Sequence, residues 1–125
     1  MTQPPGTIPV IGVTDAAARL EAGTSGGPTP VLVDVREPGE FLDVRAEGAV
    51  LMPMSQLAER HVELPKDRPL LVICASGGRS AAATSFLLRS GWTDVMNVEG
   101  GTTAWAKAGL PVRRGEIAPG EGELR

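Results

Sequence analysis

Two apolar runs in the chain are almost continuous rather than alternating with polar residues. They span Val31–Val35 and Leu70–Cys74. Strands covered on both faces, as in a parallel sheet, have such runs, whereas a strand with one wet face alternates. A proline precedes each run, and two glycines follow the second one closely. Both runs are therefore predicted to be central strands of a parallel sheet.

Three stretches around these runs are predicted to be helices, namely Asp15–Ala22, Gln56–Arg60 and Arg79–Ser90. A glycine closes the first and the last, and Ser55 is the expected N-cap of the second. In the longest helix, small and apolar residues recur at spacings of three and four, so one stripe can pack on the sheet. This stripe consists of Ala82, Ala83, Phe86, Leu87 and Ser90.

Shorter apolar runs at Val10–Val13, Ala49–Leu51 and Val95–Val98 complete about five strands. Alternating strands and helices predict a small α/β sandwich over residues 10–112, preceded by an N-terminal extension at 1–9. A surface loop is expected at residues 24–30. Residues 113–125 contain three glycines and a proline without an apolar face, which predicts a flexible C-terminal tail.

The composition is that of one globular domain. Hydrophobic residues make up 42% and charged residues 22% of the 125 positions, enough for a core without metals or disulfides. The net charge is −3 and the basic residues form no run, so nucleic-acid binding is not expected. No apolar run approaches the roughly 20 residues of a membrane span, and no signal-peptide pattern opens the chain. We therefore expect a cytoplasmic protein without a membrane partner.

Cys74 is the only cysteine, so it has no disulfide partner within the chain. It ends a predicted strand, a glycine-rich turn follows, and a helix begins at Arg79. Ligands bind at this edge of open α/β sheets. Inward backbone N–H groups and the helix start can form an anion cradle, which lowers a thiol pKa from about 8.5. The predicted site is catalytic Cys74 with the substrate-binding residues Ala75, Ser76, Gly77, Gly78, Arg79 and Ser80, both glycines being expected to supply positive φ.

Charged residues are expected close to this loop. Arg79 can meet an anionic donor or fasten the loop by pairing with a carboxylate such as Asp34, and a mixture of the two roles weighted toward fastening is favoured. Asp34 and Arg36 end the other central strand at the same sheet edge, so they are expected to support the loop. The only histidine, His61, lies in no motif and is expected at the surface, so a Ser-His or Cys-His mechanism is not supported.

From about Val10 to Pro111 the chain resembles the rhodanese homology family in four segments. Asp34–Phe41 is similar to the family's Asp-Val-Arg-Glu-x-x-Glu-Phe segment, and Cys74–Ser80 is similar to its active loop. The third and fourth matches are the C-terminal signature and its closing turn. They comprise Gly91–Val95 with Asn97–Trp105, and Gly109–Pro111, in which the glycines and Trp105 are expected to serve backbone geometry and packing.

One segment departs from the family pattern. Members commonly carry Gly-His-Ile, one further residue and Gly-Ala, whereas this chain has Val44-Arg45-Ala46-Glu47-Gly48-Ala49 and keeps only the last two. The departure bears on the local fold and the partner-facing surface, not on the cysteine.

The resemblance implies a three-layer sandwich with helices on both faces of the sheet, and a persulfide on Cys74. It implies transfer of sulfane sulfur from a donor such as thiosulfate to a thiol or cyanide, with a protein as a further acceptor class, and no metal or organic cofactor. A noncatalytic interaction or regulatory module is one alternative, although inactive members typically lack the cysteine. A phosphatase or arsenate reductase of this fold is another, but four residues separate Cys74 from Arg79 and the related phosphatases use one more.

Overall fold

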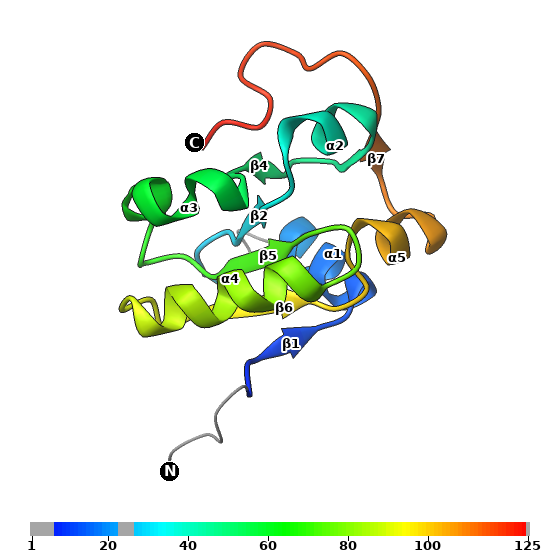
Figure 1. The fold of residues 1–125 in the computed structure, drawn as a ribbon. Coiled ribbons are helices and arrows are strands. Elements are labelled where there is room, and N and C mark those ends of the chain that lie inside the picture. The colour runs from blue at the N-terminus through cyan, green and yellow to red at the C-terminus, as the bar shows by residue number, and fades with distance from the viewer. Residues whose placement is uncertain (1–6, 23–26, 125) are drawn as a thin grey trace.

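The computed structural model describes residues 7–22 and 27–124. Residues 1–6 of the predicted extension, residues 24–26 of the predicted loop and residue 125 of the predicted tail lie outside the described part, and so does Gly23, the glycine expected to close the first helix. Five parallel strands form the central sheet in the order β1-β6-β5-β2-β4 (Figure 1). Their bounds are β1 Val10–Ile11, β2 Val31–Asp34, β4 Val50–Leu51, β5 Leu70–Ile73 and β6 Val95–Val98. The predicted α/β fold with a five-stranded parallel sheet is confirmed.

Helices cover both faces of this sheet, which gives three layers (Figure 1). Helices α1 (Val13–Ala22) and α5 (Gly101–Lys107) lie on one face, and α3 (Met54–Arg60) and α4 (Gly78–Arg89) lie on the other. Helix α2 (Pro38–Asp43) follows β2, and a 3₁₀ turn, η1 (His61–Glu63), follows α3. A small antiparallel pair, β3 (Arg45–Ala46) and β7 (Val112–Arg113), lies beside the main sheet.

Strand β5 shows why the central runs are apolar throughout. Leu70 and Val72 enter the core beneath α3 and α4, whereas Leu71 and Ile73 enter the core beneath α1 and α5. Successive residues of a strand point to opposite faces, and helices cover both faces of this sheet, so all four side chains are fully buried. In register with β5, β2 pairs Asp34 with Ile73, so both strands end at the same edge.

Two local predictions about the helices were wrong. In α4 the buried residues are Ser80, Ala83, Thr84 and Leu87, and Ala82 is exposed. The buried face is rotated because Thr84 hides its hydroxyl by donating to the Ser80 carbonyl at 2.8 Å. Helix α3 begins at Met54 with Pro53 as its cap, and the Ser55 hydroxyl instead donates to the Glu37 carboxylate.

His61 is half-buried rather than a free surface residue. Its ring packs edge-on against Phe86 and Trp92, at centroid distances of 4.9 and 5.3 Å. Its Nδ1 lies 3.1 Å from the Leu57 carbonyl, at the end of α3. The histidine therefore belongs to the packing between α3 and α4.

The C-terminal segment, residues 113–124, packs on the domain, so the expectation that it has nothing to bury is wrong. Arg45 is 1% exposed, forms an ion pair with Glu121 and donates to the Gly115 carbonyl at 2.8 Å. The Leu51 N–H donates to the Gly122 carbonyl at 2.8 Å, and Leu124 packs against the core. Arg45 lies in the segment that departs from the family pattern, and its role is to hold this C-terminal segment.

Candidate active site

Cys74 lies directly after β5, at the carboxyl edge of the sheet, and is 1% exposed. Its Sγ receives the Gly77 N–H at 3.1 Å and lies 3.2 Å from the Ser80 hydroxyl. Of the six residues predicted to line the cradle, 75–77 connect β5 to α4, and 78–80 form the first turn of α4. The structure therefore places donors around the sulfur.

Backbone conformation explains how the loop turns its N–H groups inward. Gly77 has a φ of 112°, a left-handed value that side chains strongly disfavour. Gly78 has no positive φ and is the first residue of α4. The expectation of positive φ is thus confirmed for Gly77 and wrong for Gly78. Gly77 is the residue whose lack of a side chain lets the loop close on the sulfur.

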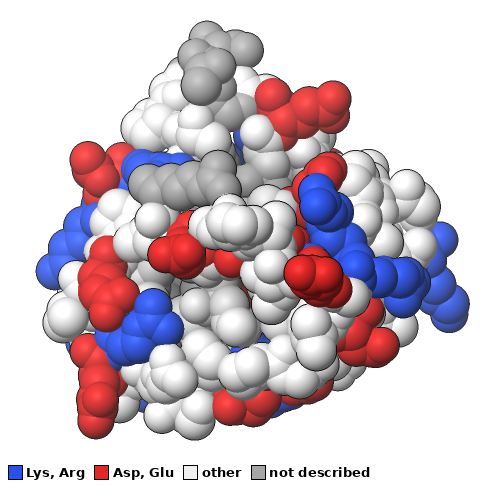
Figure 2. All heavy atoms as spheres, turned by 90° about the horizontal axis from the view of Figure 1, so that it is seen from above, with Lys and Arg blue, Asp and Glu red and all other residues white. Residues whose placement is uncertain are grey.

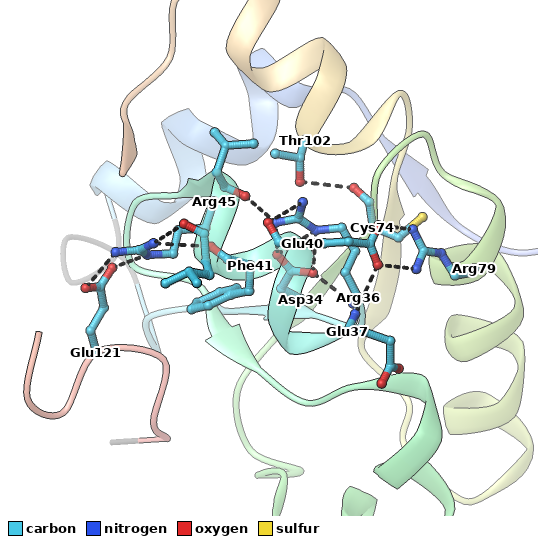
Figure 3. A network of polar contacts seen from close by, with 12 residues as sticks. Asp34, Arg36, Glu37, Glu40, Phe41, Arg45, Cys74, Arg79, Thr102 and Glu121 are labelled. Atoms are coloured by element: carbon cyan, nitrogen blue, oxygen red, sulfur yellow. Dashed lines mark hydrogen bonds and ion pairs between the residues drawn. The ribbon is translucent and has the colours of Figure 1, made fainter. Parts of the chain in front are cut away.

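The start of α5 holds the outer side of the same loop. Thr102 donates its N–H to the Cys74 carbonyl at 2.8 Å, and its hydroxyl donates to the same oxygen at 3.1 Å (Figure 3). Thr103 donates its N–H to the Ala75 carbonyl at 3.0 Å. A Cβ on Gly101 would lie 2.4 Å from the Cys74 carbonyl oxygen, so only glycine allows this approach. The loop carbonyls are drawn outward, which leaves the amides to face the sulfur.

These contacts change the ionisation of the thiol. Burial of Cys74 by itself opposes the charged form, but hydrogen bonds from the Ser80 side chain and from the amides of Ser80, Gly77 and Ser76 outweigh it. The pKa of the Cys74 thiol therefore lies below its ordinary value. A larger fraction of the sulfur is thiolate at neutral pH than in a free cysteine, and thiolate is the nucleophilic form.

Arg79 fastens the loop to α2 through Glu40, whereas the sequence indicated Asp34 as an example of its partner. Its Nη1 and Nη2 donate to the two Glu40 carboxylate oxygens at 2.7 and 2.8 Å (Figure 3). The Arg79 hydrogen bonds hold the pKa of Glu40 at about 2. Asp34 is unavailable because Arg36 already occupies it.

Asp34 and Arg36 form a buried ion pair at the end of β2. The Arg36 Nη2 lies 2.8 Å from Asp34 Oδ2, and the two residues are 3% and 0% exposed. The same Nη2 donates to the Val44 carbonyl at 2.6 Å, beyond the end of α2. Neither side chain bonds the sulfur. They hold α2 in place, and α2 carries the Glu40 that fastens Arg79.

Comparison with known proteins assigns this arrangement to a family. A family model described as the rhodanese-like domain matches residues 13–108. The chain belongs to the rhodanese-like domain family. A protein described as a sulfurtransferase, from Allochromatium vinosum, is 40% identical to it over 82 residues, which cover 66% of this chain and 77% of that protein.

Two further relatives of this rhodanese-like domain agree. The thiosulfate sulfurtransferase GlpE of Vibrio cholerae is 33% identical over 81 residues, covering 65% of this chain and 76% of that protein. The crystal structure of a rhodanese-related protein from Thermoplasma volcanium superposes with a TM-score of 0.75 at 34% identity, over 85% of this chain and 98% of that one. The rhodanese-like fold expected from the sequence is confirmed.

Sequence reasoning missed three side chains that shape the site of this rhodanese-like domain: Glu40, Asn97 and Thr102. Glu40 and Thr102 stand inside the family segments, so their positions were visible but their partners were not. Asn97 occupies a strand otherwise made of apolar residues and is 6% exposed. A buried amide in such a strand needs polar partners, and that was the available signal.

The surroundings of the domain add two observations. On the face seen in Figure 2, acidic and basic side chains are interspersed. None of the described helices combines the length and apolar character needed to cross a membrane.

Proposed function

We propose that this rhodanese-like domain is a sulfurtransferase that carries sulfane sulfur as a persulfide on Cys74. The observation that carries the proposal is the ring of donors around one buried sulfur, with the lowered pKa of its thiol. The same N–H groups that favour a thiolate also suit the terminal sulfur of a persulfide anion. The descriptions of two relatives as sulfurtransferases support this activity.

The proposed reaction has two steps, and thiosulfate is the donor that we propose. The Cys74 thiolate attacks the outer sulfur of thiosulfate, the S–S bond of the donor breaks, and sulfite leaves with the bonding electron pair. Cys74 then holds Cys–S–S⁻. In the second step cyanide or an acceptor thiolate attacks the terminal sulfur, and Cys74 leaves as thiolate. The products are thiocyanate or a new persulfide, and no net redox equivalent is needed.

The rim of the cradle suits a small donor. Ser76 and Gly78 are exposed, whereas Cys74 and Ser80 are buried. A donor that reaches the sulfur passes over this rim, where the amides and the α4 N-terminus provide positive potential. Small thiols, cyanide and a protein thiol are the acceptor classes that we propose, in a cytoplasmic setting.

Loop geometry disfavours phosphoryl chemistry. Both terminal nitrogens of Arg79 bond Glu40, so the guanidinium fork is not free to clamp a phosphate. The loop also holds only four residues between Cys74 and Arg79. A noncatalytic module is disfavoured because the chain has both the Cys74 thiol and the hydrogen-bond donors around its sulfur.

A turnover assay tests the proposal. The parent chain is incubated with thiosulfate and cyanide, and thiocyanate and sulfite are quantified; a phosphate ester replaces both reagents in a parallel arm. Equal amounts of the two products from the parent, and none above background from Cys74→Ser, are expected. Parent-level thiocyanate from Cys74→Ser, or phosphatase turnover with no thiocyanate, would overturn it.

A further inference from the structure

Asn97 lies behind the cradle and contacts two groups that serve the sulfur. It sits on β6, and its Oδ1 lies 2.5 Å from the Ser80 Oγ. Its Nδ2 donates to the Gly77 carbonyl at 3.3 Å. The Gly77 N–H donates to the Cys74 sulfur, and the Ser80 hydroxyl lies 3.2 Å from it. Asn97 itself makes no bond to the sulfur, so any effect on Cys74 passes through these neighbours.

The orientation of the Asn97 amide follows from its partners. A backbone carbonyl only accepts hydrogen bonds, so the amide must turn its NH₂ group towards Gly77. Its oxygen then faces Ser80, and that oxygen can only accept. The Ser80 hydroxyl has a single proton, and two acceptors lie within its reach: the Asn97 Oδ1 at 2.5 Å and the Cys74 sulfur at 3.2 Å.

We propose that Asn97 is a positioning residue for Cys74, because its amide oxygen competes with the sulfur for the one hydroxyl proton of Ser80. In the thiol form every group is satisfied: Cys74 S–H donates to Ser80, and Ser80 donates to Asn97. In the anionic form Ser80 must choose, and one buried acceptor loses its donor, which costs free energy. Asn97 thus limits how much the Ser80 hydroxyl stabilises the anion.

This arrangement would set the nucleophilicity of the sulfur. A thiolate that is stabilised too strongly is a weaker nucleophile, although it leaves more readily. The relevance to sulfur transfer rests on the proposed function. The competition itself is a property of the thiol and can be measured without any sulfur donor.

Charged groups around the cysteine need a design that cancels their effects. The charged residues at this edge of the sheet include Asp34 at the end of β2, Arg36 and Glu37 after it, Glu40 on α2, Arg79 on α4 and Glu99 after β6. A double-mutant cycle at Ser80 and Asn97 leaves all of them in place. It also cancels the loss of the hydrogen bond from Asn97 to Gly77. Within each Asn97 background that bond is absent both before and after Ser80→Ala, so it does not contribute to the shift that Ser80→Ala causes.

The experiment measures the pH midpoint of iodoacetamide alkylation of Cys74, in the full chain. Ser80→Ala removes one donor and should raise the midpoint. This rise is compared in the parent and in the Asn97→Leu background, where the competing acceptor is absent. Competition predicts a larger rise in the Asn97→Leu background, by about half a pH unit or more. An equal or smaller rise there would overturn the proposal.

A second background keeps the test decisive if Asn97→Leu does not fold. Asn97→Asp has nearly the same shape, and its carboxylate is a stronger acceptor for the Ser80 proton. The rise caused by Ser80→Ala should then shrink towards zero, and a rise as large as in the parent would overturn the proposal. Thr84→Val is the control for lost buried hydrogen bonding in α4, since Thr84 bonds the Ser80 carbonyl and not the sulfur. Its midpoint should equal that of the parent.

Discussion

Arg79 and Glu40 form a bidentate ion pair, in which each terminal guanidinium nitrogen donates to one of the two carboxylate oxygens. The pair joins the second residue of α4 to the middle of α2, across the mouth of the loop that holds Cys74. Because Arg36 holds α2 through the Val44 carbonyl, the loop is tied to the end of β2 by a chain of ion pairs and hydrogen bonds.

Arg79→Lys and Glu40→Gln should each slow sulfur uptake from thiosulfate several-fold, because both break the two-bond geometry. If fastening is the main role of Arg79, the double variant takes up sulfur no more slowly than the slower of the two single variants. Steady-state kcat and KM for thiosulfate check this. A rise in KM confined to Arg79→Lys, with Glu40→Gln equal to the parent, would instead assign Arg79 to donor binding.

Gly77→Ala should raise the pH midpoint of Cys74 alkylation by about one unit, since an L side chain strains the left-handed backbone that aims the Gly77 N–H at the sulfur. Gly78→Ala is the matched comparison, because it adds the same methyl group beside it, where φ is not positive and the space is open. Its midpoint should change far less. Equal shifts in the two variants would refute the role assigned to Gly77.

The ion pair of Arg45 and Glu121 makes stability depend on acid pH. Arg45 lowers the pKa of Glu121 from 4.5 to about 2, so the pair contributes fully above about pH 5 and is lost as the pH falls towards 2. Glu121→Gln should cost about 2 kcal/mol in the free energy of unfolding at pH 7, because it takes a charged hydrogen-bond partner from a buried guanidinium. Urea unfolding at pH 7 and pH 3 measures this.

Two controls accompany the Glu121 measurement. Glu123→Gln changes an exposed carboxylate in the same segment and should leave stability unchanged. The double variant Arg45→Met with Glu121→Gln removes the buried charge and should recover part of the loss. If Glu121→Gln unfolds at the same urea concentration as Glu123→Gln, the C-terminal segment does not stabilise the domain through this pair.

The features that were predicted correctly from the sequence depend on residues close together along the chain. The two central strands followed from continuous apolar runs, and the cradle followed from a strand, a cysteine and two glycines in close succession. The Arg45 contact could not be predicted, because its partner lies 76 positions away in a polar segment. The buried face of α4 was misassigned for a related reason: Ser80 and Thr84 are polar, and only their hydrogen bonds allow burial.

The pairing of Arg79 shows the same limit. The active-loop motif indicated that a carboxylate would fasten the arginine, but the choice between Asp34 and Glu40 depends on which of them Arg36 occupies. That is decided by the geometry at the end of β2, where Arg36 folds back on Asp34 two residues away.

The most direct test of the account is the intact mass of the chain after incubation with thiosulfate and removal of the small molecules. The parent should gain the mass of one sulfur atom, peptide mapping should place it on Cys74, and cyanide should remove it. Cys74→Ser, with the same fold by circular dichroism, should gain nothing. A parent chain that gains no sulfur from thiosulfate or from a panel of persulfide donors, or a gain that persists in Cys74→Ser, would contradict the claim that Cys74 carries the sulfur.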